Sequence, residues 1–193
     1  MNQPSTSRRD FLRWTAAASL ATWAATSRTR GAAPAFFAPS ASSAALERRK
    51  FGKTDMQVAV LGFGGAEIGF EKTDKETVAK LLNAALDAGL NVVDTAECYV
   101  DSEVAIGEAI GARRKEYYLF TKCGHTNVDG KRGEDWSKDG VLASVERSLK
   151  RLKTDAVDLV QLHSCSLDEL KKGACIEALE LAKKQGKTRY IGY

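Results

Sequence analysis

Four polar side chains able to do acid and base chemistry stand where predicted apolar strands end. Asp94 closes the apolar part of the segment NVVDTAECY, and Tyr99 is the last residue of that segment. Lys122 follows the apolar run in YYLFTKCGH, and His163 follows the one in DAVDLVQLHS. Because strands buried on both faces read as unbroken apolar runs, a carboxylate, a phenol, an ammonium and an imidazole at their ends require an explanation.

Together the four groups would suit the reduction of a carbonyl. A free phenol with a pKa of about 10 is a poor acid near neutral pH, and a nearby lysine ammonium lowers that pKa. Asp94 would keep Lys122 charged, while a neutral His163 would donate a hydrogen bond to the carbonyl oxygen. Tyr99 would then protonate the developing alkoxide. No side chain supplies hydride, so a nicotinamide cofactor is expected.

Taken alone, each of these residues has an ordinary structural explanation. Asp94 would cap a turn, Tyr99 would pack against its neighbours, and Lys122 would be an exposed strand end. A single histidine after an apolar strand, such as His163, is more often structural than catalytic. Their joint placement favours a functional site if the fold brings the strand ends together.

The pattern along the chain predicts strands that alternate with helices from residue 46 onward. A hairpin with its turn at 52–55 precedes a strand through 58–61 that ends in glycines. Thr73 and Glu76 form a capping box for the first helix, which Gly89 ends. Later strands are expected at 91–95, 117–121, 157–162 and in the terminal TRYIGY, and helices at 102–110, 138–152 and 176–184. This alternation predicts right-handed βαβ units and a parallel sheet.

Two α/β architectures fit such a pattern. A doubly wound sheet usually carries G-x-G-x-x-G at its first turn, but here Gly62 and Gly64 are followed by Glu67 where the third glycine is required. A parallel (β/α)₈ TIM barrel instead gathers polar residues at the carboxyl ends of successive strands. The sequence therefore favours a barrel with an N-terminal β-hairpin, incomplete here at about five strands.

The first 45 residues are expected to be a targeting segment and linker, and residues 46–193 the barrel. The opening STSRRDFLRW pairs Arg8 with Arg9 and resembles a twin-arginine export signal, followed by a weakly apolar stretch at 14–27 that is too short for a stable membrane span. The alternative is a basic, disordered tail. The resemblance implies the Tat export machinery as a partner, export to the periplasm or cell envelope, and cofactor loading before export.

Charge and cysteine spacing exclude some other functions. The net charge of +4 comes from the first fifty residues, and the remainder carries 21 basic and 23 acidic residues, so we expect no nucleic acid partner. The four cysteines have neither C-x-x-C nor metal-finger spacing. Scattered buried thiols are expected, although a disulfide stays possible in an oxidising compartment, and no metal site is predicted.

Four segments resemble the aldo-keto reductase superfamily: GLNVVDTAECYVDSEVAIGEAI, YYLFTKCG, SLKRLKTDAVDLVQLH and GKTRYIGY. The resemblance runs from about residue 46 to the end of the chain. It implies a (β/α)₈ barrel capped by a hairpin, and reduction of aldehydes and ketones as small-molecule substrates by NADPH, or in some members by NADH.

The resemblance also implies roles for individual residues. Tyr99 would be the proton donor, Lys122 and Asp94 the pair that tunes it, and His163 the group that orients the carbonyl. The residues expected to border the nicotinamide ribose are Gly64, Gly65, Ala66 and Asp94. Glu103 and Gly107 match the helix motif of the superfamily and are expected to serve folding.

Some positions depart from the superfamily pattern. Val100 stands where glycine commonly follows the tyrosine, and SCSLDEL is an unusual continuation after His163. The sequence ends in the fifth strand, before the residues that would hold the rest of the dinucleotide. Three hypotheses follow: a truncated exported oxidoreductase, a non-catalytic barrel subunit that binds or regulates a partner, and a half-barrel that pairs with a second chain.

Overall fold

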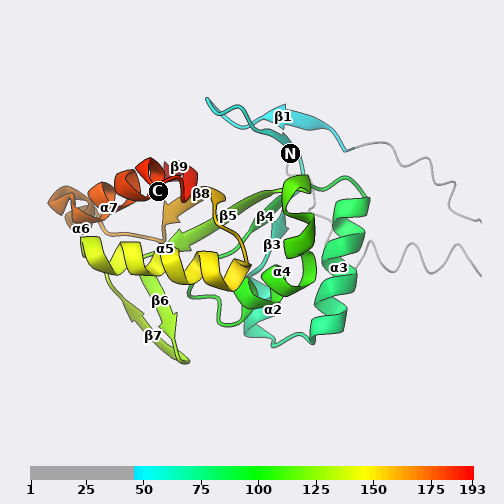
Figure 1. Cartoon of the computed structure of the whole chain (residues 1–193), viewed down its shortest axis with the longest axis horizontal. Coiled ribbons are helices and arrows are strands. Elements are labelled where there is room, and N and C mark those ends of the chain that lie inside the picture. The colour runs from blue at the N-terminus through cyan, green and yellow to red at the C-terminus, as the bar shows by residue number, and fades with distance from the viewer. Residues whose placement is uncertain (1–45) are drawn as a thin grey trace, which may run out of the picture. The chain divides into compact units, whose positions relative to one another are not determined.

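A computed structural model of the chain describes residues 46–193, and Figure 1 shows the arrangement of their elements. The predicted export signal with Arg8 and Arg9 lies outside the described residues. Among the helices that are described, none is long and apolar enough to cross a membrane.

The centre of the described part is a sheet of five parallel strands in the order β3-β4-β5-β8-β9. Their bounds are β3 Phe63–Gly64, β4 Val92–Asp94, β5 Tyr118–Cys123, β8 Val157–Leu162 and β9 Thr188–Gly192. Each strand pairs with the next parallel strand along the chain, so the strands form one continuous wall. This is the topology of successive strands in a (β/α)₈ barrel, and the predicted fold class is confirmed.

Helices connect the strands. The helical bounds are α2 Ala66–Phe70, α3 Lys75–Asp87, α4 Ser102–Ile110, the 3₁₀ helix η1 Gly111–Glu116, α5 Lys138–Leu152, α6 Leu167–Lys172 and α7 Ala174–Lys184. Helix α3 packs against α4, α4 against α5, and α5 against α7. Their buried apolar stripes, such as Val78, Leu82 and Leu86 of α3, pack with the helix-facing side chains of the strands in the larger of two apolar clusters. The smaller cluster, Met56, Phe120 and Leu159, lies on the opposite face of the sheet.

Helix α3 begins one residue later than its sequence signal suggests. The predicted cap at Thr73 is wrong, because the side chain of Asp74 accepts the hydrogen bond from the backbone N–H of Thr77 at 2.9 Å. Both residues are good caps, and only the backbone conformation distinguishes them. Gly89, with φ of +90°, follows the helix as predicted.

The predicted first strand is two strands in different sheets. Residues Gln57–Ala59 form β2, which pairs antiparallel with β1, Arg48–Lys50, and completes the predicted hairpin. The chain then passes through Val60 and Leu61, which are exposed, before Phe63 and Gly64 enter the parallel sheet as β3. The sequence predicted a single strand because the segment is a continuous apolar run, and such a pattern does not show which neighbour each part pairs with.

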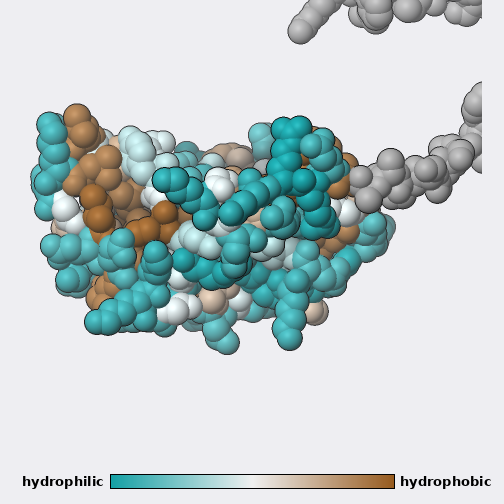
Figure 2. Space-filling model, turned by 90° about the horizontal axis from the view of Figure 1, so that it is seen from above, coloured by the Kyte–Doolittle hydropathy of each residue, from teal (hydrophilic) through white to brown (hydrophobic). Residues whose placement is uncertain are grey.

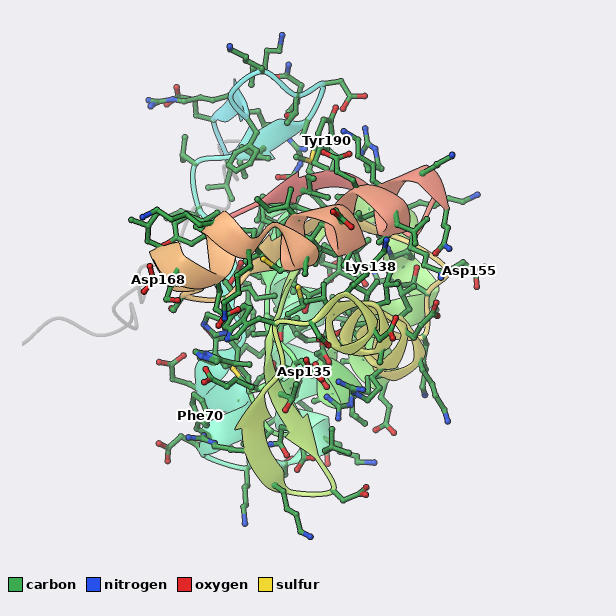
Figure 3. The ribbon with its side chains drawn as sticks, turned by 90° about the vertical axis from the view of Figure 1, so that its left-hand side faces the viewer. Phe70, Asp135, Lys138, Asp155, Asp168 and Tyr190 are labelled. Atoms are coloured by element: carbon green, nitrogen blue, oxygen red, sulfur yellow. The ribbon has the colours of Figure 1, made fainter. Side chains whose placement is uncertain are left out.

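Short elements were missed altogether. The sequence did not predict α2, η1, α6 or the second hairpin, formed by β6 His125–Val128 and β7 Lys131–Glu134. Figure 3 shows this hairpin projecting from the end of β5, with Asp135 directly after it and Phe70 of α2 beside it. Gly124, at φ +96°, makes the turn possible, since a Cβ there would lie 1.9 Å from the Trp136 ring.

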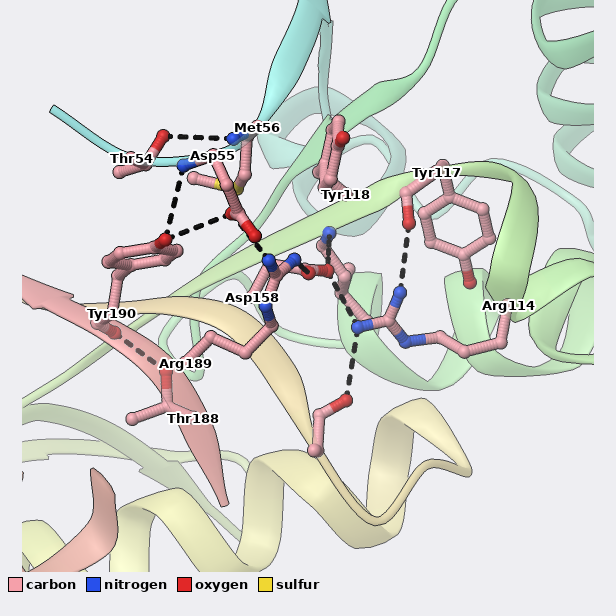
Figure 4. Close-up of polar contacts among 12 residues, drawn as sticks. Thr54, Asp55, Met56, Arg114, Tyr117, Tyr118, Asp158, Thr188, Arg189 and Tyr190 are labelled. Atoms are coloured by element: carbon pink, nitrogen blue, oxygen red, sulfur yellow. Dashed lines mark hydrogen bonds and ion pairs between the residues drawn. The ribbon is translucent and has the colours of Figure 1, made fainter. Parts of the chain in front are cut away.

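A buried carboxylate fixes the first hairpin to the sheet (Figure 4). Asp158 of β8 accepts hydrogen bonds from Arg114 at 2.7 Å, from the backbone N–H of Leu119 at 2.9 Å and from Arg189 at 2.7 Å. Arg189 also reaches Asp55 in the hairpin turn at 2.5 Å. These contacts lie at the amino ends of the strands, opposite the ends at which the predicted site residues stand.

The face shown in Figure 2 is mostly hydrophilic, and a hydrophobic area lies towards the end that carries α6 and α7. Leu167 of α6 is 63% exposed and Ile176 of α7 is 43% exposed. The apolar side chains of these two helices are therefore not fully covered within the described residues.

Candidate active site

Asp94 and Lys122 meet at the carboxyl ends of neighbouring strands. In the register of β4 and β5, Asp94 lies opposite Phe120, and Lys122 is two residues further along β5, so the two side chains share a face of the sheet. The Lys122 ammonium forms a hydrogen-bonded ion pair with the Asp94 carboxylate and donates to the carbonyl of Thr95 at 3.0 Å. Lys122 lies within β5, which runs on to Cys123, rather than after a strand ending at 121 as expected.

Tyr99 joins this pair from the loop after β4. The Lys122 Nζ atom lies 5.4 Å from the centroid of the Tyr99 ring, and the phenol oxygen has no hydrogen-bond partner among residues 46–193. The ring also packs edge-on against Phe70 at 5.5 Å. The ammonium and the phenol are therefore neighbours, as the sequence predicted.

Backbone constraints hold the tyrosine loop in place. A Cβ at Gly69 of α2 would lie 2.0 Å from the carbonyl oxygen of Tyr99, so α2 approaches the loop as closely as a glycine allows. Val100, the next residue, has φ of +50°. This left-handed conformation is costly for a β-branched residue, which gives a physical reason for the glycine expected here from the superfamily pattern.

The pKa of Tyr99 moves in the direction opposite to the expected one. Burial raises it, and the negative charge of Asp94 adds to that effect. The prediction that Lys122 lowers the pKa is wrong for this arrangement, because the lysine charge is directed to Asp94. The phenol therefore stays protonated well into the alkaline range.

His163 directly follows β8 and lies beside the tyrosine. Its backbone N–H donates to the carbonyl of Cys123 at 3.0 Å, and its ring packs edge-on against the Tyr99 ring with centroids 5.5 Å apart. Burial and the nearby charge of Lys122 lower the pKa of the imidazole. His163 is thus neutral near pH 7, which agrees with the predicted role of a hydrogen-bond donor.

Two further side chains reach His163 that sequence reasoning missed. The Sγ atom of Cys98 lies 3.2 Å from Nδ1 of His163, and the ring of His125 lies 5.5 Å from that of His163. Both residues were visible as polar positions at strand ends, since Cys98 precedes Tyr99 and His125 follows β5. They were overlooked because neither belongs to the superfamily motif.

A cavity of about 390 Å³ adjoins these groups. It is lined by Phe70 of α2, by Cys98 of the loop after β4, and by five residues of the β6–β7 hairpin: His125, Thr126, Arg132, Gly133 and Glu134. The guanidinium of Arg132 lies 5.0 Å above the Phe70 ring. Because Phe70 and His125 touch Tyr99 and His163 in turn, the cavity leads towards the reactive groups.

The other acidic residues of the tyrosine loop and α4 have structural roles. Glu97 is fully buried and binds Arg147 at 2.6 Å and Ser144, which ties the loop to α5. Glu103 accepts from Thr121 at 2.7 Å. A Cβ at Gly107 would lie 2.4 Å from the Arg151 carbonyl, so the helix packs there only with glycine. The prediction that Glu103 and Gly107 serve folding agrees with these contacts.

The residues expected at the nicotinamide ribose lie at the ends of β3 and β4. Gly64 faces open space, whereas a Cβ at Gly65 would lie 2.7 Å from Ser102 Oγ, so packing alone explains Gly65. Ala66 begins α2. The side chain of Asp94 is 36% exposed beside its ion pair. Gly64 and Asp94 therefore offer an accessible edge on which a ligand could rest.

All four cysteines are free thiols, three of them buried, as the spacing suggested. Burial raises the pKa of Cys123 to about 12 and that of Cys165 to about 11. The described part of the chain contains no cluster of three His, Cys, Asp or Glu side chains suited to a metal ion.

Comparisons with known proteins identify the family of the chain. The aldo/keto reductase family pattern matches residues 60–193. The chain is 36% identical to the uncharacterized oxidoreductase YqkF of Bacillus subtilis and 34% identical to L-galactose dehydrogenase of Arabidopsis thaliana. Each match covers 76% of this chain but 48% of the relative, so the chain spans about half the length of these curated relatives.

Among solved structures, the aldo-keto reductase AKR11C1 from Bacillus halodurans is similar in both of its forms. Its holo form matches with 36% identity and a TM-score of 0.70, over 76% of this chain and 49% of that one. Its apo form matches with 31% identity and a TM-score of 0.59, over 76% of this chain and 47% of that one. The family pattern covers more than half of the chain, and the chain belongs to the aldo/keto reductase family.

Proposed function

We propose that this chain carries the proton-donating half of an oxidoreductase that reduces aldehydes or ketones to alcohols with NADPH or NADH. The observation that carries the proposal is the convergence of Tyr99, Lys122, Asp94 and His163 at neighbouring strand ends. A scaffold that only binds a partner would need no partly buried ammonium beside a phenol. The names of the relatives, oxidoreductase and dehydrogenase, support the same class of reaction.

Tyr99 is the proton donor in this proposal. When bound, the nicotinamide supplies hydride to the carbonyl carbon, which turns the carbonyl oxygen into an alkoxide. The raised pKa of Tyr99 keeps its proton in place at neutral pH, and an alkoxide is basic enough to remove it. The phenolate left behind is stabilised by the ammonium of Lys122, 5.4 Å from the ring.

His163 and Lys122 hold the remaining charges and orientation. A neutral imidazole donates one hydrogen bond to the carbonyl oxygen and directs it towards the phenol. Asp94 and the Thr95 carbonyl fix the ammonium, so Lys122 does not swing into the substrate space. The cavity beside Cys98 and His125 would hold the rest of the carbonyl compound.

The residues at the ends of β3 and β4 fit the nicotinamide side of a dinucleotide. Gly64 leaves open space at the end of β3, and Asp94 presents an accessible carboxylate at the end of β4. Gly64 and Asp94 would border the nicotinamide ribose, with Ala66 next to them.

The test replaces the proton donor alone, in a protein that carries these residues within a complete barrel. Tyr99→Phe should lower the rate of carbonyl reduction by at least about 100-fold, because general acid catalysis contributes about that much or more, while dinucleotide binding is nearly unchanged. Rates are measured on a panel of aldehydes and ketones with NADPH and with NADH.

The matched control is Tyr117→Phe at the opposite end of β5, where the phenol only donates to the Ile110 carbonyl at 3.4 Å. This variant should keep the wild-type rate. Wild-type turnover in Tyr99→Phe would overturn the proposal. Dinucleotide binding without any reduction across the panel would favour the non-catalytic subunit instead.

A further inference from the structure

The thiol of Cys98 contacts the imidazole of His163 on the side away from the expected substrate hydrogen bond. Cys98 lies in the loop after β4, immediately before Tyr99, and its Sγ atom is 3.2 Å from Nδ1 of His163. The other ring nitrogen, Nε2, has no hydrogen-bond partner within residues 46–193. One nitrogen is therefore engaged by the protein and the other is available to a ligand.

Both groups are neutral near pH 7. Burial raises the pKa of the Cys98 thiol, so its proton is present. Burial lowers the pKa of His163, so its ring carries one proton, on either Nδ1 or Nε2. The contact then has two forms: the thiol donates to Nδ1, or Nδ1–H donates to the sulfur.

We favour the first form, in which the thiol of Cys98 donates to Nδ1 of His163. The thiol is a weak donor and its sulfur is also a weak acceptor, whereas the lone pair of a neutral imidazole is a strong acceptor. A thiol proton directed at Nδ1 therefore pairs the weak group with the strong acceptor. With Nδ1 accepting, the ring proton must lie on Nε2. The hydrogen bond on one nitrogen thereby fixes which nitrogen can donate on the other.

We propose that Cys98 is a positioning residue that holds the His163 proton on Nε2, so that the imidazole presents an N–H to the substrate carbonyl oxygen. The catalytic consequence rests on the proposed function, whereas the position of the proton does not. Cys98 acts through His163 and has no direct part in the chemistry.

Other groups around His163 act on its charge, and their effects do not depend on Cys98. Lys122 on β5 and His125 on β6 disfavour the protonated ring, Asp94 on β4 favours it, and the Tyr99 phenol is neutral. The thiol of Cys98 also lowers the pKa of His163, because protonation of Nδ1 would remove the lone pair that accepts the thiol proton. Loss of the thiol should therefore raise the pKa of His163, and a hydroxyl in its place should restore it.

The tautomer is measured by ¹⁵N NMR on the chain as it stands. We expect a pyrrole-like Nε2 and a pyridine-like Nδ1 for His163 in the wild type. The reverse pattern in the wild type would overturn the proposal without any variant. This measurement needs neither substrate nor cofactor, so it is independent of whether the protein reduces carbonyls.

Variants at position 98 then separate positioning from packing. Cys98→Ala should weaken the Nε2 tautomer preference and raise the pKa of His163 in an NMR titration, while Cys98→Ser should behave as the wild type because its hydroxyl also donates. Cys175→Ala is the matched control: it removes a buried thiol that bonds the Glu169 carbonyl at 3.8 Å and should leave His163 unchanged. Equal shifts in all three variants would indicate a packing effect and overturn the proposal.

Turnover gives the second readout, in the same complete barrel used for Tyr99→Phe. Cys98→Ala should lower kcat for reduction about three- to tenfold, the range of one net hydrogen bond, with little change in KM for the dinucleotide, and Cys98→Ser should recover most of it. An unchanged kcat in Cys98→Ala would remove the catalytic role. Turnover retained in Tyr99→Phe would instead count against the proposed function and leave the tautomer result standing.

Discussion

At the scale of single residues, the ammonium of Lys122 is paired with the carboxylate of Asp94 rather than with the phenol of Tyr99. Lys122 is bound to Asp94 and to the Thr95 carbonyl, and its field on Tyr99 is offset by that of Asp94. The free chain therefore keeps Tyr99 as an undissociated acid and His163 as a neutral donor. Both protonation states are the ones that reduction of a carbonyl requires.

The two pKa shifts predict the pH dependence of the reaction. The pKa of Tyr99 is raised above its ordinary value of about 10, so the phenol stays protonated up to that pH, and the pKa of His163 is lowered below about 6.5, so the imidazole stays neutral down to that pH. The rate constant kcat/KM for reduction should thus be flat from about pH 6.5 to 10. Steady-state kinetics across this range provide the measurement, and a fall centred near pH 8 would contradict the assignment.

At the scale of elements, strand register decides which residues can meet. Asp94 is paired with Phe120, and Lys122 lies two residues after Phe120 on the same strand. The side chains of Asp94 and Lys122 therefore point to the same face of the sheet. Thr121, one residue before, points to the opposite face and donates to Glu103 of α4. The carboxyl end of β5 therefore carries a site residue on one face and a residue that packs against α4 on the other. The buried Glu97 holds the loop after β4 against α5.

The opposite ends of the strands depend on Asp158, which receives three hydrogen bonds and has a side chain only 7% exposed. Asp158→Ala should lower the free energy of unfolding by about 3 kcal/mol, because it leaves the guanidinium of Arg114 and the backbone N–H of Leu119 without their partner. Urea denaturation gives the measurement.

The control for this prediction is Asp55→Ala in the hairpin turn. Asp55 also binds Arg189 and Tyr190, but its side chain is 70% exposed, so its loss should lower the free energy of unfolding far less than the loss of Asp158 does. Equal losses in the two variants would mean that burial does not decide the strength of these ion pairs.

At the scale of the whole molecule, the described residues form two hydrophobic clusters, one on each face of five parallel strands, and the chain spans about half the length of its relatives. The residues proposed to hold the nicotinamide side of a dinucleotide are all within this part. We further propose that residues 1–45 direct the folded protein to export, since the paired Arg8 and Arg9 precede Phe11 and Leu12 in the order of a twin-arginine signal.

The export proposal predicts a specific dependence on the arginine pair. Replacing both Arg8 and Arg9 with Lys keeps the charge but should abolish accumulation in the periplasm, because a receptor reads the guanidinium pair and not the charge alone. Cell fractionation followed by immunoblotting measures the distribution. Arg13→Lys is the control, and equal export of the double variant and the control would remove the signal assignment.

The sequence by itself determined the class of fold and the four polar groups of the site. Buried strands must be apolar, so Asp94, Lys122 and His163 stood out against the runs that precede them, and the alternation of strand and helix periods required a parallel sheet. These features are local and can be read without knowing which elements are neighbours. The strand bounds were correct to within one or two residues for β4 and β8.

Only the tertiary structure decided the features that depend on contacts between distant segments. Whether residues 57–59 pair with the hairpin or the sheet, how Cys98 and His125 reach His163, and whether Lys122 lowers the pKa of Tyr99 are settled by packing. A pKa is the sum of burial and of every nearby charge, and those neighbours come from several strands at once. The sequence could name the groups, but their distances had to come from the fold.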